Sequence, residues 1–260
     1  MIYFQLEDLS NNVKSMLKSI VLLAMCHPAH LSAKSIREKF FDSIVEDLNA
    51  LQTNELYISA LGGRLDFAFS IVAGDHLASN DIGGFQKSFS NGQFCRHRHI
   101  NYDQRFIHLS EISHAQRTKD QHDNLVQQVL RLNNNDVIDD VIDKSPLSEL
   151  IGFHAVILLP NDVMHDLHEG LCGQVLLAMF KESSTKRLLS YAEIKGRLIS
   201  FEHDSYDKKN KPPFLRKKRL HKGKIIGTAS QQMCLFRLFP IIFYEIIDRL
   251  DTKGCLYLFT

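Results

Sequence analysis

The chain has 260 residues, of which 44% are hydrophobic and 23% are charged, and this composition excludes a wholly disordered, collagen-like or low-complexity protein. Lys and Arg number 31 and Asp and Glu number 30, so the net charge of +1 gives by itself no reason to expect a nucleic-acid partner. No apolar stretch approaches the roughly 20 residues of a membrane span.

The cysteines and the N-terminal sequence indicate a compartment. The five cysteines lie far apart and form no Cys-x-x-Cys pair, a pattern that does not indicate a disulfide framework. The N-terminal sequence lacks the basic segment of a signal peptide. We therefore expect a nuclear or cytoplasmic protein that is neither secreted nor transmembrane.

Residues 1–90 are predicted to form a partial α/β core. The apolar run 19–26 has strand length, 35–51 repeats apolar residues at helical intervals, and 65–72 predicts a buried strand. This order indicates a mixed sheet covered by helices. Asp75 would then follow the end of a strand, where α/β proteins often place catalytic or metal-binding carboxylates, although many strands simply end in Gly-Asp turns.

Residues 91–150 are predicted to form an irregular, His-rich insertion with one short helix near 124–132. Cys95, His97 and His99 alternate along the chain, so an extended backbone would place all three on one side as zinc ligands. A polar, partly basic loop without a metal is the alternative.

Residues 151–260 are predicted to be α-helical. A first helix is expected after Asp162, which can cap it, with apolar residues at 163, 167, 171, 175 and 179 along one face. Further helices are expected over 190–201 and over 230–250, the latter interrupted or kinked at Pro240.

The first of these helices carries several candidate ligands. His165 and Glu169 are four residues apart, and with Asp162 and Asp166 they could converge on one divalent ion. Acidic residues that complement the dipole of a helix N-terminus are the alternative.

The segment 208–224 concentrates positive charge between the last two helices. It holds nine Lys or Arg and no acid, so its charge of +9 opposes a charge of −8 on the rest of the chain. Such a segment can contact nucleic-acid phosphates or act as a nuclear-localisation signal, and a solvated loop is the alternative. Its basic residues are Lys208, Lys209, Lys211, Arg216, Lys217, Lys218, Arg219, Lys222 and Lys224.

Short motifs follow one another in a fixed order from about residue 2 to about residue 240. They are Gly74-Asp-His-Leu-Ala-Ser-Asn-Asp-Ile-Gly-Gly-Phe85, Ser88-Phe-Ser with Phe94-Cys95, Arg117-Thr with His122-Asp, Lys144-Ser-Pro-Leu-Ser-Glu-Leu150, Leu159-Pro-Asn-Asp-Val-Met-His-Asp-Leu-His-Glu-Gly170, Gly227-Thr-Ala-Ser-Gln and Leu235-Phe-Arg-Leu-Phe-Pro240. In order and spacing these motifs resemble transposon-derived proteins of animal genomes that are related to CACTA-type (En/Spm-like) cut-and-paste transposases.

The resemblance implies an RNase H-like core, in which three acidic residues hold two Mg²⁺ ions for DNA cleavage and strand transfer. It maps the second acid onto Asp75 and leaves Glu169 and Glu245 as candidates for the third, of which Glu169 is preferred.

The resemblance also implies a metal-binding or structural module built on Cys-x-x-Cys and a later Met-His. Cys95 matches the first cysteine, and Met164-His165 matches the Met-His. Arg98 replaces the second cysteine, and because a guanidinium cannot ligate zinc, we do not expect a complete four-ligand Zn²⁺ site.

The first catalytic Asp of the family pattern precedes the strand to which residues 2–6 correspond, and the sequence begins after that point. The apolar run 254–260 suggests that the C-terminal end is cut as well. We therefore expect an inactive transposase remnant with an incomplete RNase H-like core and an unpaired sheet edge that lowers stability or promotes self-association. A non-catalytic nucleic-acid-binding module and a metal-stabilised interaction domain are the alternatives.

Overall fold

The computed structural model describes residues 1–14, 16–104, 114–132, 137–212, 215, 220, 225 and 227–250. The chain divides into two compact units, unit 1 from Met1 to Pro160 and unit 2 from Asn161 to Thr260. Helices and strands are both present, which confirms a mixed α/β composition. None of the helices in the described ranges combines the length and the apolar character that crossing a membrane requires.

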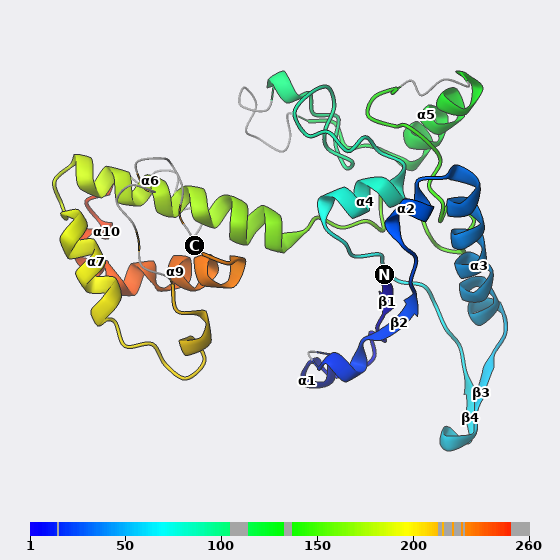
Figure 1. The fold of residues 1–260 in the computed structure, drawn as a ribbon, viewed down its shortest axis with the longest axis horizontal. Coiled ribbons are helices and arrows are strands. Elements are labelled where there is room, and N and C mark those ends of the chain that lie inside the picture. The colour runs from blue at the N-terminus through cyan, green and yellow to red at the C-terminus, as the bar shows by residue number, and fades with distance from the viewer. Residues whose placement is uncertain are drawn as a thin grey trace. The chain divides into compact units, whose positions relative to one another are not determined.

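Unit 1 combines short strands with helices of different lengths (Figure 1). In chain order these are β1 (Ile2–Phe4), α1 (Asn11–Lys14), β2 (Val21–Ala24), α2 (Pro28–Leu31), α3 (Lys34–Thr53), β3 (Leu56–Ile58), β4 (Gly63–Leu65), α4 (His76–Gly83) and α5 (Lys119–Leu132), with 3-10 turns at Leu17–Ser19, Ser59–Leu61 and Tyr102–Gln104.

The described strands form two antiparallel pairs, β1 with β2 and β3 with β4. Tyr3 lies opposite Leu22 in the first pair, and both side chains are about half exposed, at 51% and 48%. The prediction of a strand within 19–26 is confirmed by β2. Among the described residues β2 pairs with a strand on one side only, and self-association through its other edge stays a prediction.

Helix α3 confirms the helix predicted over 35–51. Its buried residues Phe41, Ile44 and Val45 recur at helical spacing and pack against Leu147 and Leu150. Each such side chain contributes about 1.5–3 kcal/mol when it is fully buried.

The buried strand predicted over 65–72 is wrong. Strand β4 ends at Leu65, and no regular structure follows before α4. The backbone N–H of Phe69 donates to the side chain of Gln52 (2.7 Å), and the N–H of Val72 donates to the carbonyl of Leu158 (3.0 Å). Phe69 and Val72 of this run pack against the cluster that contains the buried residues of α3, whereas Leu65 and Ile71 are 38% and 46% exposed.

The region predicted as an irregular insertion contains the expected helix, which begins earlier than 124 and forms α5. Its buried face carries His122, Val126 and Val129. The two valines belong to a core that also includes Phe85 and Val141, both with no exposed surface. The second half of unit 1 is therefore organised around Phe85.

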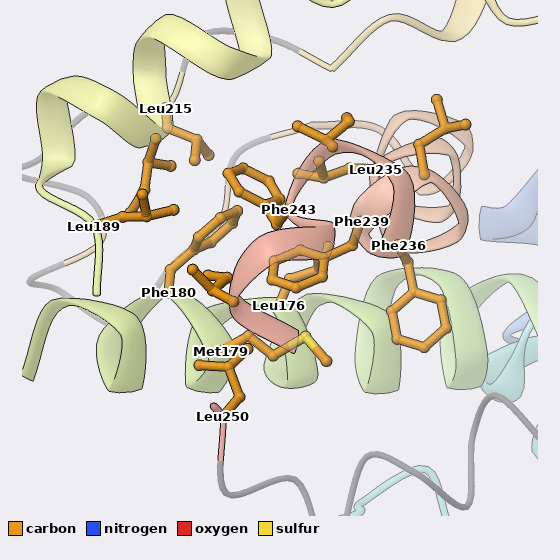
Figure 2. Packing of buried hydrophobic residues seen from close by; sticks show 14 of the residues in the cluster. Leu176, Met179, Phe180, Leu189, Leu215, Leu235, Phe236, Phe239, Phe243 and Leu250 are labelled. Atoms are coloured by element: carbon orange, nitrogen blue, oxygen red, sulfur yellow. The ribbon is translucent and has the colours of Figure 1, made fainter. Parts of the chain in front are cut away.

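Unit 2 is helical in its described part (Figure 1). It contains the π-helix η5 (Met164–Leu171), α6 (Cys172–Thr185), α7 (Tyr191–Ser200), the 3-10 turn η6 (Lys208–Asn210), α9 (Ala229–Ile242) and α10 (Tyr244–Ile247). Figure 2 shows its core, in which the ring centroid of Phe243 lies 5.6 Å from that of Phe180 and 4.8 Å from that of Phe239.

Capping residues explain where the helices of unit 2 begin. Ser190 and Glu193 form a capping box at the start of α7, which confirms the helix predicted over 190–201. Thr228 and Gln231 form another at the start of α9. The interruption predicted at Pro240 is misplaced, because α9 continues through Pro240 and ends at Ile242, before Phe243 with its φ of −120°.

The apolar face predicted for the first helix of unit 2 is wrong in part. The prediction is confirmed at Met179, which is buried, and at Leu167 and Val175, which pack against the core, whereas Val163 and Leu171 are 60% and 41% exposed. Cys172 and Leu176 face the core instead, because the π-helical hydrogen bonding of η5 closes i to i+5 and rotates the residues that follow it.

Candidate functional site

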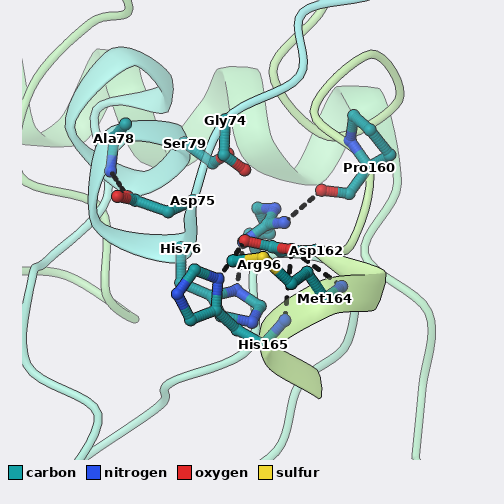
Figure 3. Close-up of polar contacts among 10 residues, drawn as sticks. All are labelled: Gly74, Asp75, His76, Ala78, Ser79, Arg96, Pro160, Asp162, Met164 and His165. Atoms are coloured by element: carbon teal, nitrogen blue, oxygen red, sulfur yellow. Dashed lines mark hydrogen bonds and ion pairs between the residues drawn. The ribbon is translucent and has the colours of Figure 1, made fainter. Parts of the chain in front are cut away.

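Asp75 begins helix α4 and does not end a strand (Figure 3), which corrects the predicted setting of this residue. Its Oδ1 accepts a hydrogen bond from the backbone N–H of Ala78 at 2.7 Å. An N-cap of this kind satisfies an otherwise unpaired amide and contributes about 1 kcal/mol. The predicted Mg²⁺-binding and catalytic role of Asp75 remains a prediction.

The rest of the motif around Asp75 is explained by close packing. Ser79 and Asn80 are buried on α4, and the Asn80 side-chain amide donates to the carbonyl of Gln86 (2.9 Å). Gly84 has φ +75°, and a Cβ there would lie 2.1 Å from the carbonyl oxygen of Asp143. Each of these positions therefore has a structural reason for its residue.

Arg96 joins the motif at α4 to the motif at Leu159-Pro160. Its side chain is almost wholly buried, and Nε donates to the carbonyl of Leu159 at 3.0 Å. It also contacts the Pro160 carbonyl and the Nδ1 of His76 (3.4 Å) (Figure 3). A further contact joins it to the Oδ1 of Asn80 (3.4 Å). A buried guanidinium requires such partners because its desolvation is unfavourable.

Of the predicted zinc ligands near Arg96, His97 has a polar contact of its own, whereas the buried Nε2 of His99 has no hydrogen-bond partner among the described residues. Cys95 is a free, half-buried thiol, and the Nδ1 of His97 lies 3.1 Å from the carbonyl oxygen of Val156. Burial lowers the pKa of His97, and the Arg96 guanidinium lowers it further. Within the described ranges, no three His, Cys, Asp or Glu side chains group as metal ligands. Zinc binding by Cys95, His97, His99 or His165 thus remains a prediction.

Arg98, which stands where the family pattern has a cysteine, joins two segments of the insertion. Its Nη1 donates to the carbonyl of His114 at 2.9 Å, and its backbone pairs with Gln116 in an isolated antiparallel bridge. The N–H of Arg117 donates to the carbonyl of His97 at 2.9 Å in the same stretch. These bonds place Arg117 in the interior of unit 1.

Arg117 and Asp140 form a buried ion pair that the sequence reasoning missed. Nη2 of Arg117 lies 2.6 Å from Oδ1 of Asp140, and their side chains are 0% and 2% exposed. Asp139 and Asp140 both have positive φ, 48° and 73°, in a two-residue turn between the paired Ile138 and Val141. This geometry usually selects Asn-Gly. The signal available in the sequence was two acidic residues between two apolar ones.

Burial perturbs the titration of the groups around this pair. It raises the pKa of Asp140 to about 7, although the Arg117 guanidinium acts to lower it. It also lowers the pKa of His122 to about 4, and Arg117 adds to that effect. The ring of Phe85 is close to both His122 and Arg117: its centroid lies 5.0 Å from that of the His122 ring and 5.5 Å from the Arg117 guanidinium carbon.

Asp162 caps the start of unit 2's first helix, as predicted. Its Oδ1 accepts from the N–H groups of Met164 (3.0 Å) and His165 (3.2 Å) (Figure 3). Its Oδ2 lies 2.5 Å from the Nδ1 of His165, and this hydrogen bond is the main reason that the pKa of Asp162 is lowered. This carboxylate therefore has two structural roles: it caps the first backbone N–H groups of the helix, and its negative charge is favourable at the positive end of the helix dipole.

The candidates for a third acid have different surroundings. Glu169 is exposed on η5, in unit 2, whereas Asp75 belongs to unit 1. Glu245 forms an ion pair with Arg197, with 2.5 Å between Oε2 and Nη2. A catalytic role for Glu169 remains a prediction.

The described part of the basic segment is attached to α9. Lys208, Lys209 and Lys211 are exposed, and the carbonyl of Lys211 accepts from the Gln231 side chain at 3.1 Å. Just before them, buried Asp207 forms an ion pair with the Arg237 side chain. The other predicted nucleic-acid contacts lie outside the described residues and are Arg216, Lys217, Lys218, Arg219, Lys222 and Lys224.

Comparisons of the chain with protein-family models, with curated proteins and with solved structures found no match.

Proposed function

We propose that this chain is a remnant of a CACTA-type cut-and-paste DNA transposase, in which the retained motifs hold the fold and do not cleave DNA. The order and spacing of the motifs over most of the chain support the ancestry. The mixed helix and strand composition of unit 1 is compatible with an origin in an RNase H-like core.

The observation that carries the proposal is that residues within the motifs, or directly beside them, make contacts between distant parts of unit 1. Arg96 joins α4 to Leu159, 63 residues away, and Arg117 joins Asp140, 23 residues away. Gly84 lies against Asp143, so the Gly-Gly-Phe motif packs on the segment that precedes Lys144-Ser-Pro. The motifs therefore form one structural framework within unit 1.

Two of the acids considered as Mg²⁺ ligands have structural partners, since Asp75 caps α4 and Glu245 pairs with Arg197. Glu169, the preferred third acid, is exposed on η5. In this proposal Asp75 and Glu245 serve the fold, and no metal-dependent step is assigned to them.

DNA nicking and strand-transfer assays with Mg²⁺ or Mn²⁺ test the proposal. We expect no metal-dependent cleavage from the full chain, the Asp75→Ala variant or the Asp75→Asn variant. Asn is as good an N-cap as Asp, so Asp75→Asn keeps the structural role of the side chain and removes its charge. Cleavage by the full chain that disappears in Asp75→Asn, with the thermal stability unchanged, would refute an inactive remnant.

A second candidate function, non-catalytic nucleic-acid binding, is supported by the charge of the segment 208–224 and by its attachment to α9. Each phosphate that the segment neutralises should steepen the fall of affinity with salt. Fluorescence anisotropy measures this effect when the affinity for duplex DNA is compared at about 50 mM and about 200 mM salt. Unchanged binding after charge reversal at Arg216, Lys217, Lys218 and Arg219 would exclude it.

A further inference from the structure

A pocket of about 340 Å³ lies in unit 2 between the end of α6 and the start of α7. The chain turns back at Arg187, which has φ +53°, and the N–H of Leu188 donates to the carbonyl of Ser183 at 2.9 Å. This turn places the first residues of α7 next to the last residues of α6. The volume is in the range of small-molecule sites.

The floor of the pocket is apolar and belongs to the core of unit 2. Phe180 and Ile194, from α6 and α7, are 3% and 2% exposed, and Leu220 completes the apolar lining. Figure 2 shows Phe180 directed into the core with Leu215 on the same side. The Tyr191 hydroxyl, which also lines the pocket, donates to the Leu215 carbonyl. The accessible apolar surface of the described lining comes from Tyr191 and Leu220, which are partly exposed, and an apolar ligand body would replace water there.

The rim of the pocket carries a cation and two hydroxyl groups. Lys181, Ser184 and Thr185 contribute them from α6. Lys181 has no ion pair with any residue that the structure describes, whereas the neighbouring Lys186 is paired with Glu182 at 2.6 Å. Among the residues that the structure describes, none of those lining the pocket is acidic. The charge of the rim therefore favours an anion.

We propose that this pocket binds a small amphipathic anion, which has an apolar body and a single carboxylate, sulfonate or phosphate group. The body would cover Tyr191 and Leu220, and the anionic group would bind Lys181 with support from the Ser184 hydroxyl. This combination of an apolar lining and a few polar groups on one side is that of an organic-ligand site. The inference does not depend on transposase ancestry.

The fluorescent probe 8-anilinonaphthalene-1-sulfonate has the required chemistry and tests the site in the full chain. We expect one probe per chain, displaced by octanoate or by phenyl phosphate and not by octanol, which lacks the charge. The competitor that displaces the probe at the lower concentration shows whether the pocket prefers an aliphatic carboxylate, like octanoate, or an aromatic phosphate, like phenyl phosphate.

The Lys181→Met variant should raise the Kd of the probe about three- to tenfold, as expected for one charge-assisted contact at a partly exposed position. Lys181→Arg should restore binding, and Lys195→Met, which removes an exposed lysine of α7 outside the pocket, should not change it. Melting curves show whether the variants are folded. Equal Kd values for Lys181→Met and the unmodified chain, or displacement by octanol as effective as by octanoate, would overturn the proposal.

Discussion

His122 and Asp140 should oppose each other in the pH dependence of the stability of unit 1. The pKa of His122 is about 4 in the folded chain and ordinarily 6.5, so between these values the unfolded chain binds more protons. The free energy of unfolding therefore falls as the pH falls through this window. For Asp140 the pKa is about 7 in the folded chain and ordinarily 3.8, so its contribution falls as the pH rises.

The two contributions have similar sizes because one pKa unit corresponds to about 1.4 kcal/mol. His122 supplies about 3 kcal/mol and Asp140 about 4 kcal/mol over their windows, so they largely cancel between pH 4 and 6.5. In the Asp140→Asn variant, the contribution of Asp140 is removed and only that of His122 remains. Its free energy of unfolding should rise by about 3 kcal/mol more than that of the unmodified chain from pH 4 to 6.5.

Urea unfolding followed by circular dichroism at several pH values measures these slopes, since the chain has no Trp for fluorescence. Slopes are compared between variants because all other titrating groups are shared. Absolute stabilities are not compared, because Asp140→Asn also changes the group that is buried beside Arg117. The matched variant His122→Phe should have the opposite slope. Equal slopes in all three proteins, or an NMR titration that gives His122 a pKa near 6.5, would refute the reasoning.

The other predictions concern packing, backbone conformation and capping, and thermal melting checks each of them. Gly84→Ala should lower stability by about 2 kcal/mol or more, because the backbone is left-handed and Asp143 blocks the added Cβ. Gly196→Ala in α7 should raise stability by about 0.5–1 kcal/mol, because its Cβ meets no atom within 4 Å. A loss of stability in both variants would contradict this account. Ser190→Ala removes the cap of α7 and should lower stability by about 1 kcal/mol, while Ser190→Asp should not. Phe239→Ala should lower it by about 3–5 kcal/mol, and a loss below 1 kcal/mol would mean that the described core is wrong.

Elements with regular periodicity and capping residues were predictable from the sequence. Helix α3 shows its apolar spacing over five turns, and α7 is marked by Ser190 and Glu193. Helix α4 was missed because Asp75 was interpreted as the residue after a strand, although a helix N-cap has the same local sequence signal. An apolar run such as 65–72 does not distinguish a strand from a segment that packs irregularly on a helix.

The polar interior could not be predicted, because its contacts join distant parts of the chain. Nothing local in the sequence shows that Arg96 meets the Leu159 carbonyl or that Arg117 meets Asp140. The π-helix had no recognisable signal either, and it changed which residues of the following helix face the core. Local periodicity was therefore informative about helices and uninformative about the contacts that organise unit 1.

The buried pair of Arg117 and Asp140 also has a consequence for how this sequence can diverge. Loss of either partner leaves an uncompensated charge in the interior, whereas replacement of both by apolar residues of similar volume is tolerated far better. The two positions should therefore change together in related chains. A relative that lacks the arginine should also lack the acid, and its turn would then be free to adopt the Asn-Gly sequence that this backbone favours.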